Sequence, residues 1–225
     1  MRISGLRTTI RSVSSRAPNP NSEIRIPKSL LVLASSSPRR AEILTTLGIP
    51  FEVDPANVDE DLIPGESAQT AAARLADAKA LQIAQRHWQK WTLAADTLVV
   101  CDGAILGKPR NGADAGRMLR TLSGRQHRVV TGLRLRRGTD PGHGVVEESR
   151  VAIAPLSEEE IRWYVATGEP RDKAGAYAVQ GLGSRFIEAV EGSYTNVMGL
   201  PARAVYRLMR DAGDSALALL ALSFP

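Results

Sequence analysis

Four basic side chains stand at places in this chain where they could grip a phosphate group. Arg39 and Arg40 follow the run Ser35-Ser-Ser-Pro38, and Lys79 and Lys108 lie further along the chain. Cations of this kind clamp phosphates, whereas nearby carboxylates can hold a divalent metal and orient a water molecule. Together with carboxylates, the set predicts hydrolysis of a phosphate ester or anhydride.

The carboxylates that could join these cations come from two segments. Asp96 interrupts the apolar run 91–101, although aspartate is rare in strands and costly to bury without a partner. Its position therefore calls for a metal, a cation or a reaction. A second carboxylate is expected from the acidic loop that contains Asp59, Glu60 and Asp61.

The helix that is expected to start at Pro38 has cations where acids are usual. Ser37 can cap this helix, and a capping box would then place Glu or Gln at position 40, where Arg40 stands beside Arg39. Cations at the positive end of a helix are unfavourable. We therefore expect an anion there, held by backbone N–H groups, serine hydroxyls and guanidinium groups. The alternative is that both arginines point into water.

The two lysines belong to elements that could aim them at the same site. Lys79 lies in the apolar stripe of a helix expected over residues 67–87, so its ammonium either reaches solvent or points into a pocket. Lys108 follows a hairpin whose turn is Asp102-Gly103. This hairpin can bring Lys108 near Asp96.

Several familiar phosphate-binding and nucleophile motifs are missing from the sequence. The pair Gly107-Lys108 has no glycine five residues before it and no Ser or Thr after it, so it is not a Walker A loop. There is no Gly-x-Gly-x-x-Gly that opens a helix after a strand, and no Gly-x-Ser-x-Gly elbow. Hydride transfer and serine hydrolysis are therefore disfavoured.

The length and composition predict one folded domain over residues 29–225. The chain has 225 residues, of which 43% are hydrophobic, and this is enough for a full core. The single cysteine, Cys101, excludes an internal disulfide and a zinc cluster, and it is typical of a reducing compartment such as the cytoplasm. No apolar run approaches the length of a membrane span, so we expect no membrane partner.

The net charge of +5 comes from the first 28 residues. They contain six basic residues and one acid, whereas the remaining 23 basic and 23 acidic residues cancel. A neutral domain lacks the electrostatic footprint of a nucleic-acid binder, so no nucleic-acid partner is expected. Residues 1–28 are predicted to be a basic disordered extension or a targeting segment. Their Arg- and Ser-rich composition favours disorder, and the recurrence of Ile3, Leu6, Ile10 and Val13 at helical spacing favours a targeting segment. A presequence would make the location mitochondrial.

Strand-like and helix-like segments alternate along the domain, which predicts an α/β fold with a mixed β-sheet flanked by helices. Gly192 to Gly199 is expected to be a turn, and the polar, glycine-rich segment 169–184 a long loop of the kind that often carries binding groups. Within that loop, Gln180 offers both a donor and an acceptor, which suits recognition of a base edge. The other expected elements are strands near 30–33, 91–101, 104–106, 127–135, 145–154 and 186–190, a short extended piece over 51–54, and helices near 38–47, 67–87, 113–122, 157–167 and 201–209.

From residue 30 to 212 the sequence resembles the Maf family. The motifs that carry the resemblance, in chain order, are Leu33-Ala-Ser-Ser-Ser-Pro-Arg-Arg40, Val58-Asp-Glu60, Ala76-Asp-Ala-Lys-Ala80, Ala95-Asp-Thr97, Gly107-Lys-Pro109, Leu122-Ser-Gly124 with His127, Asp172-Lys-Ala-Gly-Ala-Tyr-Ala-Val-Gln-Gly181, Gly192-Ser-Tyr, and Asn196-Val-Met-Gly-Leu-Pro201. The resemblance implies the inosine-triphosphatase-like fold. It also implies a pyrophosphatase that splits a nucleoside triphosphate into a monophosphate and pyrophosphate with a divalent metal, Mg or Mn.

The resemblance also implies a role for individual residues. Asp96 falls on the family's catalytic base, and the specificity positions fall on Arg39, Thr97 and Gln180, whose residue types match the subgroup that hydrolyses dTTP and UTP. The metal is expected on Asp96 and Glu60. The residues expected to bind the phosphates are Ser35, Arg40, Lys79 and Lys108.

Three functional alternatives follow from these observations. The first is hydrolysis of dTTP and UTP, with a nucleoside triphosphate as partner and a homodimer as one oligomeric state to test. The second keeps the chemistry but takes modified pyrimidine triphosphates as substrates, a house-cleaning role. The third is a non-enzymatic cell-division regulator that binds nucleic acid or a protein partner, and the neutral charge of the domain argues against it.

Overall fold

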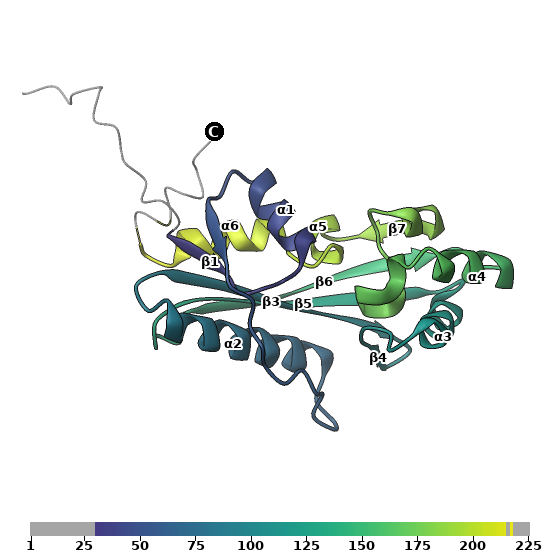
Figure 1. Ribbon diagram of the computed structural model, residues 1–225, viewed down its shortest axis with the longest axis horizontal. Helices are drawn as coiled ribbons and strands as arrows, with labels where there is room; N and C mark the ends of the chain where they lie inside the picture. Colours follow the sequence, from purple (N-terminus) through teal and green to yellow (C-terminus); the bar gives the residue numbers. More distant parts are fainter. Residues whose placement is uncertain (1–29, 215–216, 218–225) are drawn as a thin grey trace, which may run out of the picture.

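The computed structural model describes residues 30–214 and residue 217 (Figure 1). The predicted extension or targeting segment, residues 1–28, lies outside the described residues. The structure therefore leaves that prediction untested.

The described part of the chain folds around a mixed seven-stranded sheet with the order β2-β1-β3-β5-β6-β7, in which β4 pairs with β3 off this path. β1 is parallel to β2 and β3, and the other pairs are antiparallel. This arrangement confirms the expected mixed α/β fold. The strands are β1 (Leu31–Leu33), β2 (Phe51–Val53), β3 (Trp91–Cys101), β4 (Ala104–Leu106), β5 (Gln126–Arg137), β6 (His143–Ile153) and β7 (Ile187–Glu191).

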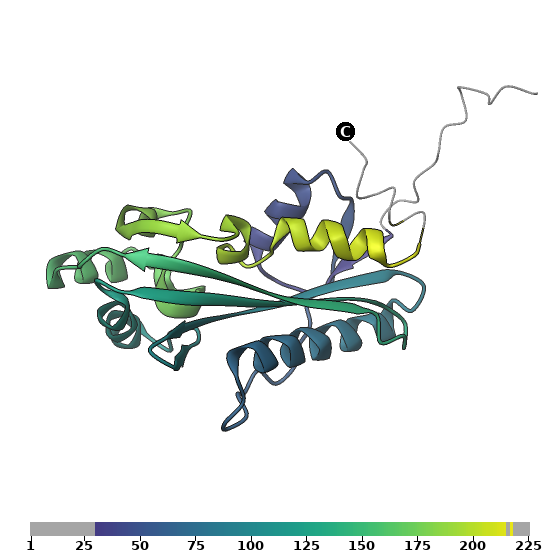
Figure 2. The ribbon, with the colours of Figure 1, turned by 180° about the vertical axis from the view of Figure 1, so that it is seen from behind.

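Helices cover both faces of this sheet (Figures 1 and 2). Three of the described α-helices begin after a serine that was expected as the cap, Ser37, Ser67 or Ser157. Ser67 accepts a hydrogen bond from a backbone N–H of the first turn of its helix, and Ser157 forms the predicted capping box with Glu160. The α-helices are α1 (Pro38–Thr46), α2 (Ala68–Arg86), α3 (Gly112–Leu122), α4 (Glu158–Ala166), α5 (Tyr194–Val197) and α6 (Ala202–Asp211). The 3₁₀ helices are η1 (Glu169–Asp172), η2 (Ala174–Ala176) and η3 (Leu182–Phe186).

One face of the sheet is covered by α2, which packs closely on β3 and β5 (Figures 1 and 2). The close approach needs Gly132 on β5, because a Cβ there would lie 2.3 Å from the carbonyl oxygen of Ala72 on α2. The alanines along α2 allow the same short separation. Side chains of α2 are thereby held against the middle of β3.

The opposite face has two cores. Near the start of β3, α1 and α6 pack on leucines of β3 and β5. Near its end, α3, α4 and η2 pack around Val99, Cys101 and Val129. Because both faces of β3 are covered, this strand is apolar at nearly every position, as expected for a buried strand.

Two segments differ from the sequence-based expectation. The expected turn over 192–199 contains α5, whose first turn is capped by the Ser193 hydroxyl. The expected loop over 169–184 is divided into η1, η2 and η3, with Gly175 at φ 70°. Short 3₁₀ turns lack the long apolar periodicity that identifies a helix in a sequence, so their pattern reads as a loop.

Candidate active site

The candidate site lies where β3 loses its neighbour on one side. β1 pairs with residues 91–93 of β3 and β4 pairs with residues 99–101, so within the described sheet residues 94–98 have no strand on that side. Asp96 and Thr97 stand in this gap. As successive strand residues they point to opposite faces of the sheet.

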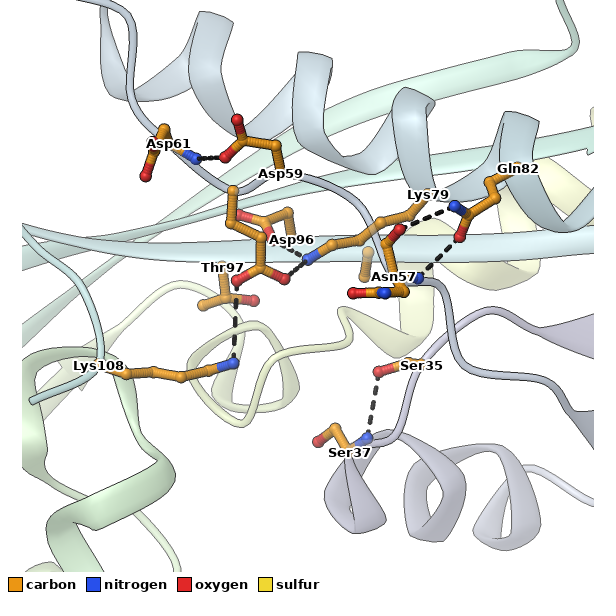
Figure 3. Close-up of polar contacts among 12 residues, drawn as sticks. Ser35, Ser37, Asn57, Asp59, Asp61, Lys79, Gln82, Asp96, Thr97 and Lys108 are labelled. Atoms are coloured by element: carbon orange, nitrogen blue, oxygen red, sulfur yellow. Dashed lines mark hydrogen bonds and ion pairs between the residues drawn. The ribbon is translucent and has the colours of Figure 1, made fainter. Parts of the chain in front are cut away.

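Lys79 and Asp96 form a buried ion pair on the face covered by α2 (Figure 3). The Lys79 ammonium nitrogen lies 2.5 Å from Asp96 Oδ1, and the two residues are 7% and 6% exposed. The ammonium therefore points into the site, and the alternative that it reaches solvent is wrong. Asp96 gains the cation that its position in an apolar strand requires.

Glu60 is a second carboxylate partner of the Lys79 ammonium. Its Oε1 lies 2.6 Å from the Lys79 nitrogen, and its Oε2 lies 3.9 Å from that of Lys108. Burial raises the pKa of the Glu60 carboxyl, but the hydrogen bond and charge of Lys79, together with Lys108 and Arg40, lower it below its usual value. Glu60 is therefore ionised at neutral pH.

The other two members of the acidic loop take no part in this cluster. Asp59 and Asp61 are exposed, and the Asp61 N–H donates to Asp59 Oδ1 at 2.9 Å. Figure 3 shows both side chains away from the ion pair. Of these three acids, Glu60 is the one that contacts the Lys79 ammonium.

Ser35 and Arg40 connect the loop after β1 to β3. Ser37 stands at the N-cap of α1 without a side-chain cap, and its N–H donates to Ser35 Oγ (Figure 3). Arg40 Nη1 also donates to Ser35 Oγ, at 3.0 Å, and to the carbonyl oxygen of Ala95, at 2.8 Å. That carbonyl belongs to the unpaired stretch of β3, so a guanidinium group replaces the missing strand.

Arg40 has two further protein acceptors. Its Nε donates to the carbonyl oxygen of Gly199 at 2.8 Å, and its Nη2 donates to Thr97 Oγ1 at 3.2 Å. Burial lowers the pKa of Arg40, and the charge of Asp96 partly offsets this. Four of its five N–H groups therefore have acceptors within the described protein. These contacts explain much of why a cation stands at the start of this helix.

Thr97 belongs to a hydroxyl network on the face opposite Asp96. Its Oγ1 lies 3.0 Å from Thr131 Oγ1, and Thr131 donates to the carbonyl oxygen of Asn196. A Cβ on Gly199, which has φ 106°, would lie 3.4 Å from Thr97 Oγ1. Thr97 is thus held by β5 and by the segment after α5.

The residues expected to select the base lie on the other wall. Arg39 Nη1 lies 3.4 Å from Asp172 Oδ2, and Asp172 also binds Lys173. The idea that both arginines of the helix start point into water is therefore wrong. Gln180 is half-buried, and within the described residues its side chain has no hydrogen-bond partner.

All nine predicted site residues line one pocket of about 490 Å³. These are Ser35, Arg39, Arg40, Glu60, Lys79, Asp96, Thr97, Lys108 and Gln180. The elements that carry them are far apart in the chain, and the opened middle of β3 brings them together. Cations and carboxylates share the pocket, as the sequence predicts.

Three further residues of this wall were not predicted from the sequence: Asp172, Lys173 and Tyr177. All three lie in the glycine-rich segment. Tyr177 shares a 2.8 Å hydrogen bond with His127 Nε2, and burial lowers the pKa of His127 to about 4. The length of the segment signalled a binding wall, but its local pattern gave no sign of these partners.

Other sites are not evident in the described part of the chain. No group of three or more His, Cys, Asp or Glu side chains there is arranged to hold a metal ion. Among the described helices, none combines the length and apolar character of a membrane span.

The fold and the site define an α/β protein with a charged pocket suited to an anionic ligand. The chain belongs to the Maf family, because the family model described as Maf-like protein matches residues 30–212.

Relatives of similar length support this membership. A protein named dTTP/UTP pyrophosphatase from an Anaeromyxobacter species is 51% identical over 187 residues, which cover 81% of this chain and 89% of the relative. Proteins of the same name from Geobacter metallireducens and Koribacter versatilis are each 48% identical. They match 82% and 81% of this chain and 97% and 94% of their own lengths.

Among solved structures, a HAM1 protein from Coxiella burnetii aligns with a TM-score of 0.44 and 16% identity, covering 85% of this chain and 96% of that chain. A likeness of this degree supports no inference about function.

Proposed function

We propose that this chain hydrolyses dTTP and UTP to the nucleoside monophosphate and pyrophosphate. The observation that carries the proposal is the buried Lys79 ammonium between the Asp96 and Glu60 carboxylates, at the floor of a pocket lined by further cations. The relatives that match most of the chain bear the name of this activity.

Asp96 is the proposed general base. Its Oδ1 is bound by Lys79, and its Oδ2 has no hydrogen-bond partner among the described residues, so Oδ2 can accept a proton from water. A bond forms between the water oxygen and the α-phosphorus, and the bond from that phosphorus to the bridging oxygen breaks. Pyrophosphate leaves with the electron pair of the broken bond.

The phosphates are proposed to bind the cationic side of the pocket. Lys108 is mostly exposed and is free to swing toward a triphosphate, whereas Lys79 is fixed between its carboxylates. Ser35 offers its hydroxyl, and Arg40 keeps one N–H that has no acceptor among the described residues. Arg40 thus both holds the wall and binds the ligand.

A divalent metal fits the donor set. Mg²⁺ and Mn²⁺ prefer oxygen ligands, and Mg²⁺ is commonly bound by one or two carboxylates together with substrate phosphates. Asp96 and Glu60 both lie within 2.6 Å of the Lys79 nitrogen and are the residues that would hold it. When bound, such a metal neutralises charge that develops on the phosphates.

The base is proposed to be selected by Arg39, Thr97 and Gln180. The Gln180 amide can accept from N3–H and donate to O4 of uracil or thymine. A purine would be rejected by its size and because these polar groups would stay unpaired, which is costly in a buried site.

The test is release of pyrophosphate from a panel of ordinary and modified nucleoside triphosphates. We expect dTTP and UTP to be the best ordinary substrates, and Asp96→Asn to lower kcat by about 10²- to 10⁴-fold, the range for loss of a general base. Asp61→Asn is the matched control, since it neutralises an exposed acid of the nearby loop. Undiminished hydrolysis by Asp96→Asn would show that the base is another group.

The same panel distinguishes the remaining alternatives. A higher kcat/KM for modified pyrimidine triphosphates than for dTTP and UTP would favour the house-cleaning role. Failure to hydrolyse any triphosphate would favour the non-enzymatic regulator.

A further inference from the structure

The Glu169 carboxylate is a hub at the rear of the pocket wall that carries Gln180. Its Oε1 accepts hydrogen bonds from the Tyr164 hydroxyl, at 2.8 Å, and from the N–H of Gly183, at 3.1 Å. Its Oε2 accepts from the N–H of Leu182 at 2.8 Å. Three donors therefore converge on one side chain.

Tyr164 extends this hub to the other side of Gln180. The tyrosine is fully buried on α4, and its hydroxyl oxygen accepts from the N–H of Ala178 at 3.1 Å. Glu169 and Tyr164 together bind backbone N–H groups before and after Gln180. The segment that presents Gln180 is thus held at both ends.

The backbone of this segment lies directly against the hub. A Cβ on Gly181 would lie 2.5 Å from Glu169 Oε1, and a Cβ on Gly183 would lie 2.5 Å from the Tyr164 hydroxyl oxygen. The two glycines are therefore needed for space. Such close contact leaves the backbone beside Gln180 little room to shift.

Glu169 is suited to this role because it is ionised. Burial raises its pKa, but the N–H groups of Leu182 and Gly183 and the Tyr164 hydroxyl lower the pKa below its usual value. A carboxylate only accepts hydrogen bonds, and every group that meets it here is a donor. The donor and acceptor roles in the hub therefore match.

Gln180 depends on this support for its position. Its side chain lines the pocket and has no hydrogen-bond partner among the described residues. No contact from its own amide fixes it there, so the backbone on either side sets the part of the pocket that the side chain can reach. A shift of about 1 Å in such a group is enough to spoil recognition.

We propose that Glu169 and Tyr164 are positioning residues for base selection, acting through the 178–183 segment that presents Gln180. The inference rests on the proposed function. It assigns the exclusion of the larger purines to the position of the pocket wall that carries Gln180, and the rigidity of that wall to the hub. Guanine is the sharpest competitor, because its N1–H and O6 offer the same donor and acceptor as N3–H and O4 of uracil and only its size differs.

Glu169→Gln tests the hub with little change of shape. One carboxylate oxygen becomes an NH₂ group, and whichever way the amide turns, this group faces a backbone N–H of Leu182 or Gly183. One N–H then loses its acceptor. Tyr164→Phe removes the other half of the hub and keeps the ring, so it serves as the second variant should Glu169→Gln fold poorly.

The measurements are kcat and KM for UTP, dTTP and GTP, and hydrogen exchange of the backbone over 178–183. For both variants we expect the ratio of kcat/KM for UTP to that for GTP to fall by about tenfold, the effect of one lost buried hydrogen bond. The loss should lie mainly in KM for UTP, with kcat within about twofold, and exchange should accelerate over 178–183. Glu159→Gln, an exposed acid of α4, is the control that should change neither.

Three outcomes would overturn the proposal. The first is an unchanged UTP to GTP ratio in folded variants with faster exchange, which would mean that loosening the segment does not affect selection. The second is an equal fall of kcat for all nucleotides with the ratio unchanged, which would indicate a merely structural role. The third is unchanged exchange in both variants. A wild-type protein that hydrolyses neither UTP nor dTTP would instead refute the proposed function, while the exchange data would still decide whether the hub holds the segment.

Discussion

At the scale of single residues, Lys79 shows how a charged side chain can be kept in a buried position. Its ammonium has carboxylate partners on both sides and almost no exposure to solvent. A buried ion pair contributes little net stability, since the desolvation of its charges offsets their attraction. The proposed reaction gives the reason for keeping it, because the ammonium holds Asp96 and Glu60 in register in the pocket.

Replacement of Lys79 by Met should separate this role from packing. Methionine keeps much of the length and apolar stem, but it removes the ammonium that binds both Asp96 and Glu60. We expect kcat/KM for UTP to fall by at least about 100-fold, as for loss of a positioned charged group. Lys90→Met, which removes a surface lysine paired with Glu52, is the control. Wild-type kinetics in Lys79→Met would contradict the assignment.

His127 predicts a dependence of stability on pH. Its pKa is lowered by burial from 6.5 to about 4, so on acidification the unfolded state takes up a proton before the folded state does. The folded state is fully favoured above about pH 6.5, and stability is lost as the pH falls toward 4. At about pH 5 the loss is about 2 kcal/mol.

The measurement is the free energy of unfolding of wild type and His127→Gln by urea titration at about pH 7.5 and about pH 5. Glutamine can still donate to the Tyr177 hydroxyl but does not titrate. The difference in unfolding free energy between the two proteins should therefore change by about 2 kcal/mol in favour of the variant at the lower pH. A difference that is the same at both pH values would show that His127 does not titrate as its burial implies.

At the scale of elements, the site depends on two short strands that leave the middle of β3 unpaired. β1 and β4 each pair with only three residues of β3, and Asp96 and Thr97 occupy the interval between them. Arg40 binds the exposed carbonyl of Ala95 in this interval. A long strand with interrupted pairing thus supplies both a rigid support and an opening for ligand.

The contact between α2 and β5 should control the geometry of the Lys79 ion pair. Gly132→Ala places a methyl group 2.3 Å from the Ala72 carbonyl oxygen, so α2 must move away from the sheet. We expect a loss of about 1 to 3 kcal/mol in unfolding free energy, as for other overpacked sites, and a lower kcat/KM because α2 carries Lys79.

Gly116→Ala in α3 is the matched control for this prediction. A Cβ there meets the flexible end of Arg120 and Ile161 at ordinary contact distances. Since alanine favours a helix over glycine by about 1 kcal/mol, this variant should be as stable as wild type or more so. Gly132→Ala with wild-type melting temperature and kinetics would show that α2 is not so closely fitted.

At the scale of the whole molecule, the charge is divided between the tail and the domain. Residues 1–28 contain six basic residues and one acid, and the rest of the chain is neutral overall. The family match and the described structure both begin at residue 30. We therefore expect the domain alone to catalyse the proposed reaction, without a contribution from the basic segment.

Removal of residues 1–28 tests this division. The shortened chain should keep kcat/KM for UTP within about twofold and should show no salt-dependent retardation of DNA in a gel, because a neutral domain releases few counterions on binding. Size-exclusion chromatography with light scattering of both chains would show in the same experiment whether the predicted homodimer forms. DNA binding by the shortened chain would revive the regulatory alternative.

Much of the fold and the membership of the site could be predicted from the sequence. Caps, turn residues and apolar periodicity are local signals, so the ends of α2, the turn at Asp102-Gly103 and the buried strand around Asp96 were predicted close to where they lie. The residue types of the charged set also indicated phosphate chemistry. Short 3₁₀ turns and α5 were missed because too few residues carry their pattern.

The sequence by itself determined which elements form and which charged residues must find partners. Only the tertiary structure decided who those partners are, because the contacts join positions far apart: Arg39 pairs with Asp172, 133 residues away, and Arg40 with Gly199, 159 residues away. The same holds for the hub at Glu169. A hydrogen bond depends on distance and direction in space, and local patterns along a chain specify neither for segments that meet only when the sheet and its helices have packed.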